Sequence, residues 1–149
     1  MSEPLEIKVA RTHPDARMPT KGSAYAAGWD LYSLEDIVVP FRDSVRLRTG
    51  LHVAIPVGYE GQVRARSSLG SKGLILPHSI GTIDADYRGE LFILMTWIGK
   101  GDSYVVKAGE RVAQLLITPI PKSEFTEVGL EELGDTARGE GGFGSTGRF

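Results

Sequence analysis

Leu91-Phe-Ile-Leu-Met-Thr-Trp97 is the most apolar run of the chain, and Val112-Ala-Gln-Leu-Leu-Ile117 is a second run of the same kind. Short continuous apolar runs that are bounded by turn residues are typical of buried strands. Elsewhere apolar residues recur at every second position, as in Leu5-Glu-Ile-Lys-Val9, Val45-Arg-Leu-Arg48 and Gln62-Val-Arg-Ala-Arg66. This alternation is typical of half-buried strands, so the sequence predicts a protein built mainly of β-strands.

Turn residues divide the chain into many short segments. Glycine and proline fall between the apolar stretches, at positions that include Gly28, Pro40, Gly50, Gly70, Pro77, Gly109 and Pro119. Many short strands at close spacing predict an all-β fold, either a jelly-roll-like barrel or a sandwich. Helix is expected only as single turns at residues 67–71 and 127–133.

A chain of 149 residues is most simply one domain, because about 150 residues bury enough surface for a core of their own. The only shift in composition comes after Leu133, where a polar, glycine-rich stretch begins. We therefore expect residues 1–133 to form one β-barrel domain. Residues 134–149 are expected to form a flexible C-terminal tail.

Charge and composition exclude several classes of function. The net charge is −2 and the basic residues are scattered, which argues against binding to long nucleic acid or to a membrane surface. No apolar run is long enough to span a bilayer, and the N-terminus lacks the features of a signal peptide. Cysteine is absent, so disulfides and thiolate chemistry are excluded. A cytoplasmic protein is the expectation.

Two side chains that are easily damaged by heat, asparagine and cysteine, are missing, and arginine outnumbers lysine eleven to six. Loss of heat-labile residues is a trend of thermophile proteins. Codon bias in a GC-rich genome explains the same composition, so both explanations stay open.

The segment from Gly81 to Glu90 carries the densest set of chemical groups. Asp84 follows an apolar pair and would emerge from a strand into a turn, where a carboxylate can orient and deprotonate a water molecule. Tyr87 could offer its flat face to a sugar. The alternative is a polar hairpin whose acids face water and whose tyrosine is ordinary packing.

A second cluster favours anion binding. A strand is expected to end at Arg66, and Ser67 and Ser68 follow where a short helical turn starts. Free N–H groups at such a start bind anions, with hydroxyl and guanidinium groups adding to the site. The alternative is a serine that only caps the turn.

Polar residues near two further strands are weaker signals. Asp30 could hold a hydrated Mg²⁺, which prefers oxygen ligands, or could hydrogen-bond a turn. Gln114 interrupts a buried strand and therefore needs a hydrogen-bond partner there. For Arg111 a structural salt bridge is favoured over a phosphate contact.

The chain ends with Arg138-Gly-Glu-Gly-Gly-Phe-Gly-Ser-Thr-Gly-Arg-Phe149. Its glycines match the pattern of dinucleotide-binding folds, but only five residues follow Gly144, too few for the helix that this pattern requires. Freed backbone N–H groups, hydroxyls and a guanidinium can cradle phosphates, and Phe143 can stack on a nucleobase. The tail is therefore interpreted as a lid over a nucleotide, against the alternative of a disordered terminus.

Taken together, five segments resemble the trimeric deoxyuridine triphosphatase (dUTPase) family and appear in the family's order. They are Ala27-Gly-Trp-Asp-Leu-Tyr-Ser33, Arg66-Ser-Ser-Leu-Gly70, Gly81-Thr-Ile-Asp-Ala-Asp-Tyr-Arg-Gly89, Gly109-Glu-Arg-Val-Ala-Gln114 and Arg138-Gly-Glu-Gly-Gly-Phe-Gly-Ser-Thr-Gly147. The resemblance implies hydrolysis of dUTP to dUMP and pyrophosphate, which keeps uracil out of DNA and supplies dUMP. It also implies a homotrimer whose tails cross to neighbouring subunits, so that three chains share each site.

The resemblance also implies roles for the nucleoside-binding residues. Asp84 would activate the water that attacks the α-phosphorus, and Tyr87 would pack on the deoxyribose and exclude a 2′-hydroxyl. The hairpin that reads uracil would use Gly81, Thr82, Ile83 and Asp84, together with Phe92. His78 stands where some members have an asparagine near uracil.

The phosphate groups would be bound by a second set of residues. Phosphate contacts are implied for Ser67, Ser68 and Gln114, with support from Arg66. Asp30 would hold Mg²⁺ through water. The closing lid would use Arg138, Phe143, Gly144, Ser145 and Thr146, with Phe143 over the uracil.

Some residues depart from the family pattern, and two other functions compete. Trp29 stands where tyrosine is common, and Ser68-Leu-Gly70 stands where many members have Gly-Leu-Ala. A dCTP deaminase shares the Arg-Ser-Ser-Leu-Gly type of phosphate segment but has a different third segment. A non-catalytic dUTP-binding regulator on the same trimer is the remaining alternative.

Overall fold

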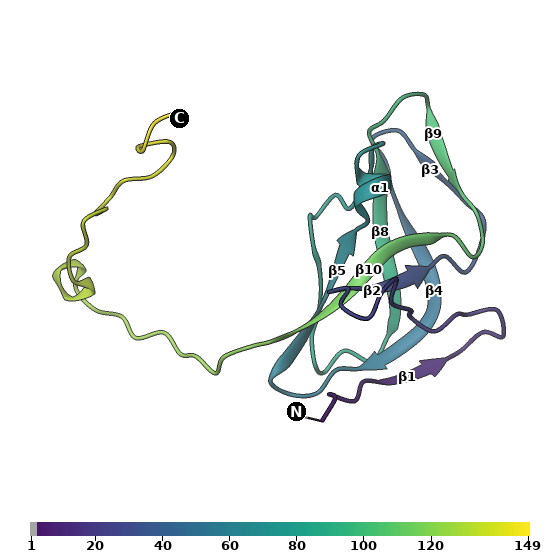
Figure 1. Ribbon diagram of the computed structural model, residues 1–149, viewed down its shortest axis with the longest axis horizontal. Helices are drawn as coiled ribbons and strands as arrows, with labels where there is room; N and C mark the ends of the chain where they lie inside the picture. The colour runs from purple at the N-terminus through teal and green to yellow at the C-terminus, as the bar shows by residue number, and fades with distance from the viewer. Residues whose placement is uncertain (1–2) are drawn as a thin grey trace.

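A computed structural model describes residues 3–149 and shows three antiparallel sheets (Figure 1). The first sheet has the order β1 (Lys8–Arg11), β4 (Ser44–Ala54), β8 (Glu90–Trp97) and β6 (Leu74–Ile75). The second has the order β2 (Trp29–Tyr32), β10 (Arg111–Pro119), β5 (Tyr59–Ala65) and β7 (Gly81–Ile83). The third is the pair β3 (Ile37–Pro40) and β9 (Ser103–Val106).

Strands of all three sheets contribute to one buried core, which confirms the prediction of a single-domain, all-β fold. The sheets do not close on themselves, so the arrangement is a sandwich and not a closed barrel. The two most apolar runs both form internal strands, which have a neighbouring strand on each side. β8 lies between β4 and β6, and β10 lies between β2 and β5. Leu91, Ile93 and Met95 on β8 are completely buried.

In the part of the chain that the structure describes, helix is confined to the two predicted places. α1 (Ser67–Gly70) is a single turn directly after β5, and η1 (Leu130–Leu133) is a 3-10 turn near the end of the chain. Within residues 3–149, no helix is long and apolar enough to cross a membrane.

A bulge interrupts β4 at the point where this strand crosses β8. The pairing register shifts between Arg48, which lies opposite Phe92, and His52, which lies opposite Glu90. Gly50 lies inside the bulge with φ of +69°, and a Cβ atom there would lie 2.8 Å from that of Ala16. Backbone conformation and packing therefore both require glycine at this position.

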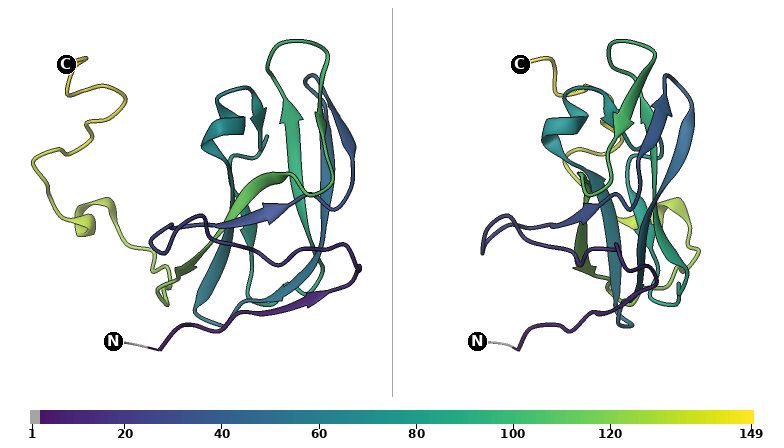
Figure 2. Two further views of the ribbon diagram at one scale, coloured as in Figure 1. Left: turned by 45° about the vertical axis from the view of Figure 1, so that its right-hand side comes forward. Right: turned by 90° about the vertical axis from the view of Figure 1, so that its right-hand side faces the viewer.

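The last thirty residues leave the sandwich after β10 ends, and they extend away from it as a separate arm (Figures 1 and 2). The Ile120 N–H still donates to the Gly58 carbonyl, at 2.8 Å. Beyond this bond, Phe125 and Phe143 are fully exposed, and Leu130 is 81% exposed. The arm therefore carries apolar side chains that the sandwich of the same chain does not cover.

Candidate active site

A small cavity of about 150 Å³ lies between β7 and the start of β8. Its lining residues are Thr82, Ile83, Asp84, Tyr87, Glu90 and Phe92. Five of them were predicted as site residues from the sequence, and the structure brings these five together. Glu90 was part of the singled-out segment but had no predicted role.

The Asp84 carboxylate lies on a tight turn directly after β7. The Tyr87 N–H donates to the Asp84 carbonyl at 3.1 Å, which closes the turn. The Tyr87 hydroxyl donates to the Glu90 carbonyl at 2.8 Å, and a Cβ on Gly89 would lie 2.6 Å from Tyr87 Cζ. The hydroxyl end of the tyrosine ring therefore lies close against the backbone of Gly89, and the same side chain lines the cavity.

Two carboxylates line this cavity, and their surroundings differ. Glu90 is only 10% exposed in its side chain and pairs with Arg48 through two bonds, Nη2 to Oε1 at 2.9 Å and Nε to Oε2 at 3.1 Å. The Arg48 hydrogen bond lowers the pKa of Glu90, against the opposing effect of burial. Glu90 therefore stays ionised and accepts a proton poorly.

Asp84 is exposed, and in residues 3–149 no basic side chain lies within 4.0 Å of its carboxylate. Of the two acids, Asp84 is thus the one that is free to bind a water molecule and take its proton.

The hairpin before Asp84 places the remaining nucleoside-binding candidates. β7 pairs with β5, so that Gly81 lies opposite Val63. His78 is exposed and its ring lies beside Gly81, because a Cβ on Gly81 would be 3.3 Å from His78 Nε2. One face of the Phe92 ring is covered by the Arg46 guanidinium, 4.4 Å from the ring centroid.

A second hollow of about 330 Å³ lies near the opposite end of β5. Its lining residues are Asp30, Arg66, Ser67, Ser68 and Gln114. All five were predicted from the sequence as phosphate or metal contacts. They come together because β2, β10 and β5 are neighbours, with Gln114 opposite both Asp30 and Arg64 in register.

The hydroxyls of Ser67 and Ser68 are exposed at the start of α1. The residue that caps this turn is Arg66, and no side chain makes the capping hydrogen bond. The alternative interpretation of a serine that only caps the turn is therefore wrong. Both hydroxyls remain available to a ligand in the hollow.

Gln114 has the partner that its burial requires, since its Nε2 donates to the Ala65 carbonyl at 3.1 Å. A Cβ on Gly28 would overlap the Gln114 side-chain oxygen and lie 3.1 Å from its Cβ. Glycine at position 28 therefore leaves the space that the Gln114 side chain occupies.

Asp30 lies between two guanidinium groups, with Arg66 Nε at 3.8 Å and Arg111 Nη1 at 3.7 Å. Arg66 also donates to the Arg111 carbonyl at 3.0 Å. Arg111 thus makes the predicted structural ion pair, yet at the rim of the anion hollow.

The donor set around Asp30 fits Mg²⁺ only in company with a phosphate. No group of three or more acidic, histidine or cysteine side chains suited to a metal occurs in the described part of the chain. Mg²⁺ keeps several waters and is commonly held by one or two carboxylates together with substrate phosphates. A single carboxylate beside an anion hollow matches that manner of binding.

The two cavities are well separated within one chain. Ile83, which precedes Asp84, lies opposite Gly61, whereas Arg66 follows the end of β5. The five residue steps from Gly61 to Arg66 span about 17 Å at the rise of an extended strand. The predicted lid residues 138–146 lie on the arm, away from the sandwich (Figure 1).

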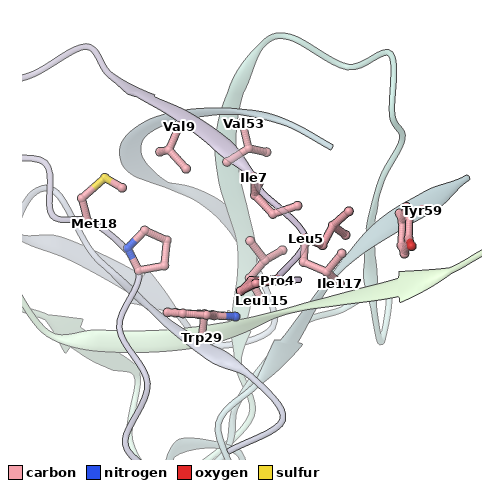
Figure 3. Close-up of a pocket in the computed structure, with 11 residues that line it drawn as sticks. Pro4, Leu5, Ile7, Val9, Met18, Trp29, Val53, Tyr59, Leu115 and Ile117 are labelled. Atoms are coloured by element: carbon pink, nitrogen blue, oxygen red, sulfur yellow. The ribbon is translucent and has the colours of Figure 1, made fainter. Parts of the chain in front are cut away.

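A cavity larger than either of these, of about 580 Å³, lies elsewhere, between the N-terminal segment and the second sheet (Figure 3). Trp29, Met18 and Leu115 are among its lining residues, and none of the lining side chains is charged. This groove is mostly apolar, with the Tyr59 hydroxyl and the Trp29 ring nitrogen among its lining groups and no charge that could bind a phosphate. The sequence did not predict it, because its residues come from six separate stretches of the chain.

The sequence profile of the dUTPase family matches residues 14–147. A deoxyuridine 5′-triphosphate nucleotidohydrolase from Syntrophotalea carbinolica is 49% identical over 147 residues, covering 96% of this chain and 97% of the relative. The Candida albicans protein of that name is 42% identical, over 95% of this chain and 88% of its own length. The solved dUTPase of Staphylococcus bacteriophage 80alpha with dUpNHpp superposes with a TM-score of 0.87 at 32% identity, over 96% of this chain and 99% of that one. The chain that carries these two cavities therefore belongs to the dUTPase family.

Proposed function

We propose that this protein hydrolyses dUTP to dUMP and pyrophosphate, which removes dUTP before it can enter DNA and supplies dUMP for dTMP synthesis. The observation that carries the proposal is the exposed Asp84 carboxylate, in one cavity with the ring of Tyr87. A base for water and a flat surface for a sugar are the two groups that a nucleotide hydrolase needs at the α-phosphate.

In the proposed reaction, Asp84 accepts a proton from a water molecule as that water attacks the α-phosphorus. The bond from the α-phosphorus to the bridging oxygen breaks, and pyrophosphate leaves. Glu90 does not compete for the proton because its pKa is lowered by Arg48. Mg²⁺ bound with the substrate would offset the charge of the triphosphate, and Asp30 would hold it through water.

The nucleoside would lie on the β7 hairpin. Backbone groups of Gly81, Thr82 and Ile83 face the base, with His78 and Phe92 at the edges of the same region. Tyr87 would pack against C2′ of the deoxyribose, leaving no room for a 2′-hydroxyl. The triphosphate would extend into a hollow that offers the two hydroxyls of α1, the amide of Gln114 and the guanidinium of Arg66.

One chain does not bring these two halves together, and this separation supports assembly. We propose a homotrimer in which the Asp84 cavity of one chain faces the Arg66–Ser68 hollow of another. The exposed apolar residues of the arm, which include Phe125, Leu130 and Leu133, support the same conclusion, because they need a surface to cover them.

The tail, residues 134–149, would act as a lid that is exchanged between subunits. In the open form Arg138 turns back on its own segment, and the Gly141 N–H donates to its carbonyl at 3.0 Å. Closure would bring Arg138, Gly144, Ser145 and Thr146 to the phosphates and Phe143 to the uracil. Excluding water in this way strengthens the charge interactions within the site.

Product analysis after incubation with dUTP, dCTP or dTTP and Mg²⁺ tests the proposal. Release of dUMP and pyrophosphate from dUTP is expected. A deaminated base would identify a dCTP deaminase, and binding without turnover would identify a non-catalytic dUTP-binding protein. Hydrolysis in excess chelator would contradict the Mg²⁺ requirement.

A further inference from the structure

The bulge of β4 lies behind the turn that carries Asp84 and Tyr87. It places two side chains, Arg48 and His52, on either side of Gly50 and toward the start of β8. Neither residue lines the Asp84 cavity. Both nevertheless make hydrogen bonds to the segment that forms its wall.

Each of the two side chains makes hydrogen bonds to a different residue of this segment. Arg48 forms its pair of bonds with the Glu90 carboxylate, and His52 Nδ1 lies 2.8 Å from the Arg88 carbonyl. Since the carbonyl can only accept, His52 must carry its proton on Nδ1. Arg88 and Glu90 flank Gly89, and the hydroxyl end of the Tyr87 ring lies against Gly89.

One hydrogen bond connects this segment to the ring of Tyr87. The Tyr87 hydroxyl donates to the backbone carbonyl of Glu90, the residue whose side chain Arg48 holds. Tyr87 is 39% exposed, and the hydrogen bond of its hydroxyl goes to Glu90. A shift of Glu90 would therefore move the ring directly.

We propose that Arg48 and His52 are positioning residues that set the Tyr87 ring against the sugar and so determine how strongly the enzyme prefers deoxyribose over ribose. The inference rests on the proposed function, because it names a determinant of specificity for that reaction. Without the hydrogen bonds of Arg48 and His52, the Tyr87 ring can move back by the small distance that a 2′-hydroxyl needs. Turnover of dUTP depends less on this distance, since Asp84 is the first residue of the turn, whereas Arg48 and His52 bond to residues that follow Tyr87.

The test compares kcat/KM for dUTP with kcat/KM for UTP in wild type, Arg48→Met, Arg48→Lys and His52→Leu. In Arg48→Met the preference for dUTP should fall roughly tenfold, the low end of what a lost hydrogen bond to a charged group costs. Arg48→Lys should keep part of the preference, because lysine keeps the charge but not the two parallel bonds. His52→Leu should lower the preference by a smaller factor.

Lys107→Met is the matched control, because it removes an exposed ion pair, with Asp36 at 4.0 Å, that lies away from both cavities. Its preference should equal that of wild type. The double variant Glu90→Gln/Arg48→Met should lose no more preference for dUTP than the more affected of its two single variants, since both changes break the same ion pair.

Several results would overturn the inference. One is an Arg48→Met protein with wild-type assembly whose preference stays within twofold of wild type. If the losses of dUTP preference add up in the double variant, Arg48 does not act through Glu90. If His52→Leu keeps the wild-type preference, His52 does not help to position Tyr87. If Arg48→Met fails to fold, a wild-type preference in Arg48→Lys contradicts the need for paired bonds. A wild type without dUTP hydrolysis would instead refute the proposed function, and the inference with it.

Discussion

At the scale of single residues, the carboxylates of Asp84 and Glu90 line one cavity but differ in their neighbours and therefore in how readily they accept a proton. Arg48 holds Glu90 in its charged form, whereas Asp84 faces the cavity without a basic partner within the described residues. The sequence predicted Asp84 because a strand ends in a turn there. It could not predict the Arg48–Glu90 pair, because the two residues are 42 positions apart and meet only through the register of β4 with β8.

Asp84→Asn should reduce dUTP turnover by about 10²–10⁴-fold, the usual contribution of a general base. The amide keeps the shape of the carboxylate but cannot accept the proton, so binding of a non-hydrolysable dUTP analogue should persist. Steady-state kinetics and calorimetry measure the two quantities. Asp86→Asn, a neighbouring exposed acid in the same turn, is the control and should retain turnover. A loss below about tenfold in Asp84→Asn would mean that another group activates the water.

The Glu90 pair should also appear in the pH dependence of stability. The folded pKa of Glu90 is lowered from 4.5, so its contribution is fully present above that value and is lost as the pH falls through the folded pKa. The melting temperature of wild type should therefore exceed that of Glu90→Gln by a constant amount at pH 6–8, and the gap should narrow below about pH 4.5. A gap that is constant down to pH 3 would contradict the pairing.

At the scale of elements, hydrophobic pattern predicted the strands that have neighbours on both sides. β8 and β10 lie where the continuous apolar runs are, and the alternating runs fall on β4 and β5. Of the short strands, β7 was expected only as the strand that precedes Asp84, and β6 was not predicted, since two or three residues carry no measurable period. β1 was expected at residues 5–9 but is Lys8–Arg11, because an edge strand takes its bounds from its one partner.

Packing between elements explains why glycine stands next to Trp29. Gly28→Ala should displace the Gln114 amide from its bond with Ala65 and disturb the hollow, since the new Cβ would overlap the glutamine oxygen. We expect a higher KM for dUTP and a lower melting temperature. Gly22→Ala is the matched control, because nothing lies within 4 Å of a Cβ at that position. Equal behaviour of the two variants would show that Gln114 adapts without cost.

At the scale of the whole molecule, the chain is a sandwich core with an extended C-terminal arm. Nineteen buried hydrophobic residues form the core, whereas the apolar residues of the arm face away from it. The sequence predicted which groups the tail carries. Its composition shifts after Leu133, whereas the last strand, β10, already ends at Pro119. The docking place of the tail could not be predicted from one chain, because the surface that receives it would belong to another copy.

The separation of the two cavities on opposite ends of β5 makes the shared site the central claim, and mixed oligomers test it most directly. Asp84→Ala and the double variant Ser67→Ala/Ser68→Ala would each be purified, shown to be inactive alone, and then unfolded and refolded together. If one chain supplies Asp84 and another supplies the serines, some mixed sites have both parts intact, and dUTP hydrolysis should return in part. If the chains demonstrably mix and activity stays at the level of the separate variants, each site is built within one chain and the account is wrong.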